Sequence, residues 1–223
     1  MRLLAGVPES DETLDLGGTA RARLARIAFR LGAQPGEAEA MADEARALAE
    51  RRGDPVGLAM AVYAKGFLLF GLGRLDEAVT LLSEAIRLGD EIGNREIGIA
   101  RTILAFVLTV RGPLPLGLTH IDEMLELAGG DTDLGSVLFG AGLVHYSHFH
   151  RAWLLARMGR LDDATRAADR AVAIGRERSE PDPVAFALPV HSLVAFLAGR
   201  GEGAVGRAME AVGLADELGS PFH

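Results

Sequence analysis

Apolar residues recur at intervals of three and four along most of the chain, which is the spacing of one face of a helix. The first clear run predicts a helix from Thr19 to Leu31. Gly32 ends that run, and a second helix is predicted from Glu37 to Arg52. Similar runs and short breaks alternate through the rest of the sequence. The pattern therefore predicts an all-α protein.

A six-residue break between helical runs recurs along the chain. It reads Gly-Arg-Leu-Asp-Glu-Ala at 73–78, Gly-Arg-Leu-Asp-Asp-Ala at 159–164 and, in a weaker form, Gly-Arg-Gly-Glu-Gly-Ala at 199–204. Gly73 is expected to close the preceding helix in the left-handed conformation. Asp76 is expected to accept hydrogen bonds from the free N–H groups of the next helix. The break thus predicts a tight corner between two packed helices.

A second series of breaks has the same period. Gly53-Asp54-Pro55 ends one helix and opens the next, because Asp is a good N-cap and Pro is tolerated at the first helical position. Asp182-Pro183 and Ser220-Pro221 repeat this punctuation, and Gly93-Asn94 follows Gly53-Asp54 after 40 residues. Two independent series of breaks with the same period predict a right-handed α-solenoid of about five helix–turn–helix units.

The unit boundaries follow from these breaks. Residues 1–16 are expected to form an arm or a leading helix, and residues 17–223 a single repeat domain. An insertion after the third unit predicts a loop near 129–135, followed by one long helix from about Leu134 or Ser136 to Met158. The second helices are predicted to begin near Ala38, Ala78, Leu118, Ala164 and Ala204, and the units to lie near 17–53, 54–93, 94–130, 131–181 and 182–219, with a further helix starting at 220–223.

Composition and charge narrow the function classes. A net charge of −8 argues against a general binder of nucleic-acid backbones, which needs a basic face. The sequence has no cysteine, which fits a reducing compartment. Its apolar runs fall well short of the roughly 18–20 residues that a membrane span needs. We expect a soluble cytoplasmic protein with no nucleic-acid or membrane partner.

The units resemble tetratricopeptide repeats of the long form. The stretches that carry the resemblance are Arg30–Asp54 and His150–Ala164, and it spans roughly residues 17–223. The sequence is most similar to the C-terminal repeats of bacterial regulators that join a cyclase domain and a P-loop ATPase to helical repeats. The resemblance implies a regulatory interaction module. No G-x-x-x-x-G-K-[ST] motif is present, so nucleotide hydrolysis is not implied.

Nine of the twelve aromatic residues fall on one side of the predicted first helices. Tetratricopeptide arrays usually bind along this concave side, so the rings are candidates for a groove that takes a partner helix, an extended peptide or a small hydrophobic ligand. They can equally be core, packed on neighbouring helices. The nine candidates are Tyr63, Phe67, Phe70, Phe106, Tyr146, Phe149, Trp153, Phe186 and Phe196.

Polar candidates are weaker. His145 and His148 share a helix face and can ligate a metal, yet zinc needs a third protein ligand and none is near in sequence. Gly201-Glu-Gly-Ala-Val-Gly206 matches G-x-G-x-x-G but follows a helix instead of a strand. No zinc-protease, serine-hydrolase or cysteine-nucleophile motif is found. We therefore predict no catalytic, metal or cofactor-binding residue.

The combined prediction is a non-catalytic module of a bacterial signalling or transcription-regulatory protein. Its partner is expected to be a protein, a peptide or another domain of a longer parent chain. The alternatives are a small-molecule sensor that uses the aromatic groove and an oligomerisation scaffold. The sequence Ser220-Pro221 opens a helix that the chain does not complete. Either the chain is part of a longer protein, or this end packs on another copy.

Overall fold

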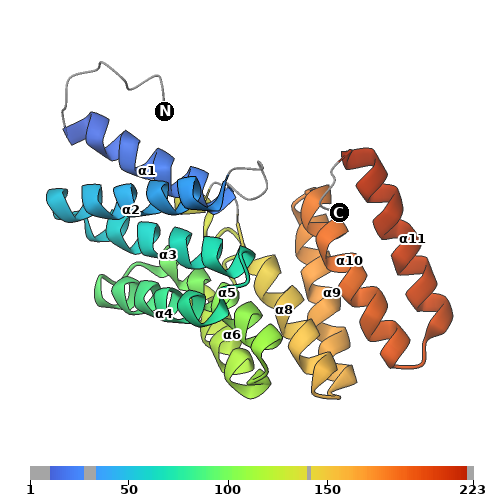
Figure 1. The fold of residues 1–223 in the computed structure, drawn as a ribbon. Coiled ribbons are helices and arrows are strands. Elements are labelled where there is room, and N and C mark those ends of the chain that lie inside the picture. Colours follow the sequence, from blue (N-terminus) through green and yellow to red (C-terminus); the bar gives the residue numbers. More distant parts are fainter. Residues whose placement is uncertain (1–10, 28–33, 140–141, 220–223) are drawn as a thin grey trace. The chain divides into compact units, whose positions relative to one another are not determined.

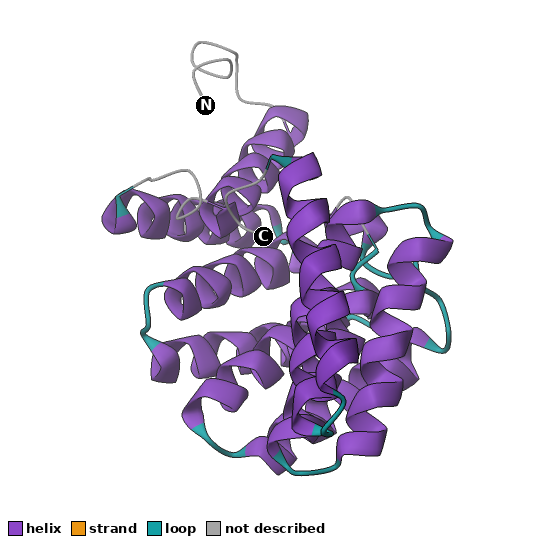
Figure 2. Cartoon of the chain, turned by 90° about the vertical axis from the view of Figure 1, so that its right-hand side faces the viewer, coloured by secondary structure: helices purple, strands orange, loops and turns teal. Residues whose placement is uncertain are grey.

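The computed structural model describes residues 11–27, 34–139 and 142–219. Figures 1 and 2 show that every regular element within these ranges is a helix, and no strand is found there. The elements in order are α1 Asp11–Ile27, α2 Pro35–Arg52, α3 Pro55–Gly71, α4 Leu75–Glu91, the 3-10 helix η3 Arg95–Ile99, α5 Ala100–Arg111, α6 Leu114–Ala128, α7 Ser136–Phe139, α8 Val144–Arg157, α9 Leu161–Glu177, α10 Pro181–Leu197 and α11 Gly201–Leu218.

Among the described helices, α1 packs with α2, α3 with α4, α8 with α9 and α10 with α11. In chain order, the first helices of the repeats are α1, α3, α5, α8 and α10, and the second helices are α2, α4, α6, α9 and α11. Each of α1 to α3 packs on the next helix in the chain, and so does each of α8 to α10. This arrangement confirms the predicted all-α fold of helix–turn–helix repeats.

The chain forms two compact units, residues 1–107 and residues 108–223, which divide within α5. Each unit has its own buried core. Leu68 and Leu82 are fully buried in the first unit, and Leu155 and Leu188 in the second. Alanine is abundant in both cores because its small side chain allows two helix backbones to approach closely. None of the described helices has the length and apolar character needed to cross a membrane.

The repeated corner has the same geometry at each of its three positions. Gly73, Gly159 and Gly199 have φ angles of 75°, 76° and 74°, in the left-handed region that favours glycine. The N–H of the arginine that follows each glycine donates to a carbonyl five residues earlier, at 2.9 Å in all three corners. The predicted left-handed closure by Gly73 is therefore confirmed.

Asp76 is not the N-cap residue of α4. α4 begins at Leu75, so Arg74 is the N-cap residue and makes no side-chain capping bond. Asp76 lies inside the first turn, where its charge suits the positive end of the helix but its side chain is past the capping position. Arg74 instead pairs with Glu77 of its own unit at 2.5 Å and with Glu39 of α2 at 2.8 Å. An ion pair thus links this corner to α2, in the preceding helix pair.

The segment around 129–158 also differs from its prediction. Instead of one long helix, α7 ends at Phe139 and α8 starts at Val144. The N–H of Leu143 donates to the carbonyl of Leu134 at 3.0 Å, so the chain doubles back on itself. Gly142 lies directly on Thr132, since an added Cβ would be 2.4 Å from the Thr132 carbonyl oxygen. A continuous helix cannot make this contact.

The ends of the predicted first helix are only partly described. α1 begins at Asp11, earlier than the predicted Thr19. Its predicted end at Leu31 and the helix start at Ser220-Pro221 lie outside the described residues.

Candidate partner-binding surface

The first unit brings four of the nine predicted rings into one row. The ring centroids of Tyr63 and Phe67 are 6.2 Å apart and those of Phe67 and Phe70 are 6.4 Å apart, all on α3. Phe70 meets Phe106 of α5 edge-on, with centroids 4.8 Å apart. Tyr63 is buried, whereas the other three rings are half-buried. The row therefore presents part of three rings to solvent, supported by a fourth.

The second unit gathers four more rings around Phe149. Phe149 of α8 is buried, and its centroid lies 6.0 Å from that of Trp153 and 5.0 Å from that of Phe186 on α10. Tyr146 meets Phe186 edge-on at 5.1 Å. Tyr146, Trp153 and Phe186 are half-buried, and Trp153 and Phe186 pack on the core of this unit. We call Tyr146, Phe149, Trp153 and Phe186 the α8–α10 aromatic cluster.

Phe196 is placed differently from the other eight candidates. It lies near the C-terminal end of α10 with 67% of its surface exposed. Leu193 and Leu197 on the same helix are exposed as well. Helical spacing did not predict this exposure, because exposure depends on which neighbouring helix covers each position.

The histidines of α8 are held neutral by their surroundings. Burial lowers the pKa of His145 to about 4, that of His148 to about 4 and that of His150 to about 3. Within the described ranges, no group of three or more His, Asp or Glu side chains is arranged to hold a metal ion. His145 and His148 thus have no third ligand there.

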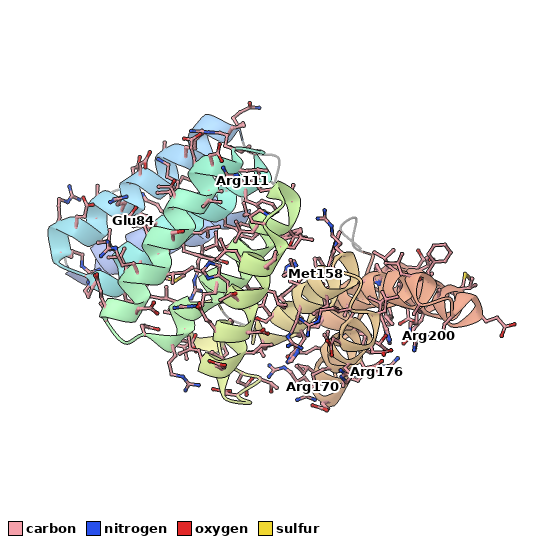
Figure 3. All side chains as sticks on the ribbon, turned by 90° about the horizontal axis from the view of Figure 1, so that it is seen from below. Glu84, Arg111, Met158, Arg170, Arg176 and Arg200 are labelled. Atoms are coloured by element: carbon pink, nitrogen blue, oxygen red, sulfur yellow. The ribbon has the colours of Figure 1, made fainter. Side chains whose placement is uncertain are left out.

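Sequence reasoning missed a charged cavity of about 530 Å³ between α9, α10 and α11. Asp169 lies 2.9 Å from His191, and Arg176 pairs with Glu210 at 2.5 Å. The guanidinium of Arg207, which also lines the cavity, donates to the carbonyl of Gly203 in its own helix. Figure 3 labels Arg176 together with Arg170, which pairs with Glu177, another lining residue, at 2.9 Å. The lining comes from three helices far apart in sequence, so no local motif signals it. The lining carboxylates Asp169, Glu177 and Glu210 thus each lie against a basic side chain.

A family model decides which group of proteins the chain is part of. Residues 20–109 and 139–200, more than half of the chain, match the family described as "Anaphase-promoting complex subunit 5". The chain belongs to this family. The first matched segment of this chain includes α2 to α4, and the second matched segment includes α8 to α10. The match therefore includes most of the helix pairs that carry the aromatic rings.

Solved structures support the same repeat fold. The apo form of RapI has a TM-score of 0.75 at 10% identity, covering 97% of this chain and 73% of its own. BtubC (BKLC) from P. vanneervenii has a TM-score of 0.62 at 16% identity, covering 95% and 94%. YrrB, described as a TPR protein with an unusual peptide-binding site, has a TM-score of 0.50 at 19% identity, covering 87% and 84%. No curated protein matches the chain.

These matches confirm that the chain has a tetratricopeptide-like repeat fold. Repeat proteins of this kind generally mediate protein–protein interactions and typically act as non-catalytic scaffolds.

Proposed function

We propose that the chain is a non-catalytic module that binds a protein or an extended peptide through the aromatic faces of its first helices. The observation that carries this proposal is the α8–α10 aromatic cluster. Tyr146, Trp153 and Phe186 are half-exposed, and Phe149 beneath them is buried. Edge-on ring contacts fix the rings before a partner arrives, so binding orders few side chains. Such rigid aromatic anchors are typical of interface hot spots.

The shape of the surface favours a protein or peptide over a small molecule. A small hydrophobic ligand is normally enclosed in a cavity of several hundred Å³ lined by apolar groups. The charged cavity between α9, α10 and α11 touches none of the nine rings. A second cavity, of about 350 Å³, lies near the start of α8, and Tyr146 is the one of the nine rings that lines it. Apart from Tyr146, the rings lie outside these two cavities, which suits a partner that lies across a surface.

The wider context of the module is part of the proposal. The resemblance of residues 17–223 to the repeats of bacterial multidomain regulators supports a role in signalling or transcriptional control, with the partner on another chain or on another domain of the same protein. YrrB, which shares the fold, is described as having a peptide-binding site, and this supports a peptide partner here.

The test uses the full chain and a displayed library of random peptides. Peptides that bind the chain are selected, and their affinity is measured by fluorescence anisotropy. Trp153→Ala and Phe186→Ala are each expected to lower the affinity of the chain for the selected peptides by tenfold or more. Truncation of an aromatic hot spot costs about 2 kcal/mol or more of binding free energy. His120→Ala, outside the cluster and on another helix, serves as the control and is expected to change nothing.

Circular dichroism of each variant separates lost contacts from lost folding. The proposal is wrong if the library yields no binders, or if folded Trp153→Ala and Phe186→Ala variants bind the selected peptides as well as the unaltered chain does.

A further inference from the structure

Second helices of both units share a stripe of residues spaced at i, i+4, i+7 and i+11. The stripe is made of small or apolar side chains, and all of its members are buried in α2, α4, α6 and α9. The stripes are Ala38, Ala42, Ala45 and Ala49 in α2; Ala78, Leu82, Ala85 and Gly89 in α4; Gly117, Ile121, Met124 and Ala128 in α6; and Ala164, Ala168, Ala171 and Gly175 in α9.

The last member of this stripe meets the beginning of the next first helix. An added Cβ on Gly175 would lie 2.7 Å from Cγ2 of Val184, in the first turn of α10. In the first unit, an added Cβ on Gly89 would lie 2.8 Å from Cγ2 of Ile97 in η3. A β-branched side chain near the start of a helix is therefore what covers this end of the stripe.

α11 repeats this spacing, but its stripe is less buried. Its members are Ala204, Ala208, Ala211 and Ala215, at a distance of 40 residues from those of α9. Ala204 is buried, Ala211 and Ala215 are half-buried, and Ala208 is exposed. The neighbouring Val212 is 55% exposed, whereas its counterpart Val172 in α9 is 4% exposed. The difference arises because α10 covers α9, and no described helix covers this side of α11.

Larger apolar side chains extend this open side. Val205 and Met209 are exposed on α11 beside Val212, and Leu193, Phe196 and Leu197 are exposed on α10. Exposed apolar groups gathered on one helix pair are unusual for a surface that faces only water. We call these six exposed residues of α10 and α11 the open edge.

Carboxylates border the open edge. Glu202 and Asp216 lie on the same side of α11 as Val205, Met209 and Val212 by helical spacing. Both are exposed, and neither has an ion-pair partner within the described chain. A partner with basic residues beside its apolar face would match this charge.

We propose that the open edge binds an amphipathic α-helix of a partner. The apolar face of that helix packs on Val205, Met209 and Val212, and a β-branched residue in its first turn lies against Ala215, as Val184 lies against Gly175. Basic residues along the borders of the same helix meet Glu202 and Asp216. This surface is separate from the α8–α10 aromatic cluster, so the two can be occupied and tested independently.

The test uses a peptide whose helix already covers an equivalent stripe. A fluorescein-labelled peptide of residues 180–198, flanked by lysines for solubility and charge, is titrated with the full chain. Binding is expected to saturate below millimolar concentration and to weaken with added salt. The same peptide flanked by glutamates, and a lysine-flanked peptide with Val184→Asp, are each expected to bind at least tenfold more weakly.

Variants of the chain locate the binding surface. Val205→Glu and Met209→Glu are each expected to lower the affinity for the lysine-flanked peptide by tenfold or more, because a buried charge replaces an apolar contact. Val137→Glu is the matched control: Val137 is also an exposed valine, at 76%, but lies on α7. Trp153→Ala is expected to leave binding of this peptide unchanged.

Three results would overturn the proposal. The first is no binding of the lysine-flanked peptide up to a millimolar concentration. The second is equal binding by Val205→Glu and Val137→Glu. The third is a concentration-dependent dimer of the chain, measured by sedimentation, that Val205→Glu dissociates, since the occupant would then be a second copy.

Discussion

Gly175 of α9 and Val184 of α10 approach so closely that an added Cβ on the glycine would lie 2.7 Å from Cγ2 of the valine. Backbone atoms of Val184 and a Cβ of Pro183 lie 3.2 Å from the same point. Real Cβ contacts are longer than this, so any side chain at position 175 must push α9 and α10 apart. The small residue sets the spacing of the two helices.

Gly175→Val is therefore expected to destabilise the chain, although valine has a better helix propensity than glycine. Overpacking of a close contact costs about 1–3 kcal/mol. Urea unfolding followed by circular dichroism measures the change. Ala215→Val, at the equivalent position of α11, is the matched control and is expected to stay within about 0.5 kcal/mol. Equal losses in the two variants would contradict this account.

Ser179 adopts a conformation that glycine occupies in the equivalent corners. Its φ angle is 55°, while those of Gly53, Gly93 and Gly219 are 61°, 65° and 59°. The left-handed conformation costs a residue with a Cβ about 1–2 kcal/mol, and glycine avoids this cost at some loss of chain entropy. Ser179→Gly is expected to raise the thermal unfolding midpoint by a few degrees, and Gly93→Ser to lower it. A lower midpoint for Ser179→Gly would show that its side chain stabilises the corner.

Asp54 is the N-cap that the sequence predicted for α3. Its carboxylate accepts the N–H of Gly57 at 2.9 Å, and Pro55 occupies the first helical position. Asp54→Ala is expected to cost about 1 kcal/mol, whereas Asp54→Asn keeps an acceptor oxygen and is expected to cost little. Both values come from urea unfolding at neutral pH. If the two variants lose the same stability, the negative charge of Asp54 matters more than its hydrogen bond.

The buried histidines of α8 predict a pH-dependent stability. Burial lowers the pKa of His145 to about 4 and that of His150 to about 3, below the value of about 6.5 in an unfolded chain. Between pH 6.5 and 4 the unfolded chain binds more protons than the folded chain. The free energy of unfolding therefore has its full value above pH 6.5. It falls as the pH is lowered, by up to about 1.4 kcal/mol per pH unit for each histidine.

His150→Gln removes one of these protonation sites. The pH dependence of the free energy of unfolding between pH 6.5 and 4.5 is expected to become shallower by about one proton. Urea unfolding at a series of pH values measures this slope, and the difference between the two chains cancels the titration of carboxylates. An unchanged slope would show that His150 is not held neutral.

Repeated turns were the most predictable part of the fold. The corners at Gly73 and Gly159 depend on a left-handed residue and a following helix start, both of which are local and leave a clear trace in the sequence. The position of Asp76 relative to the N-cap was harder to predict, because a shift of one or two positions in the start of α4 changes a cap into a first-turn residue.

The candidate site was predictable in position but not in exposure. Helical spacing placed Phe149 and Phe186 on one side of the first helices, and their rings lie 5.0 Å apart. Helical spacing could not show that Phe149 is buried while Phe196 is exposed, because the exposure of each ring depends on how neighbouring helix pairs pack. The doubled-back segment at Gly142 depends likewise on a contact with Thr132, ten residues earlier.

The common spacing of buried residues in the second helices has an evolutionary consequence. Because α9 and α11 place matching alanines at a separation of 40 residues, a duplicated copy of the segment between Gly159 and Gly199 would find a complementary neighbour on each side. Gene duplication and recombination can then lengthen or shorten such a chain by whole units. No new core has to evolve for each change in length, and the number of units becomes a heritable variable in its own right.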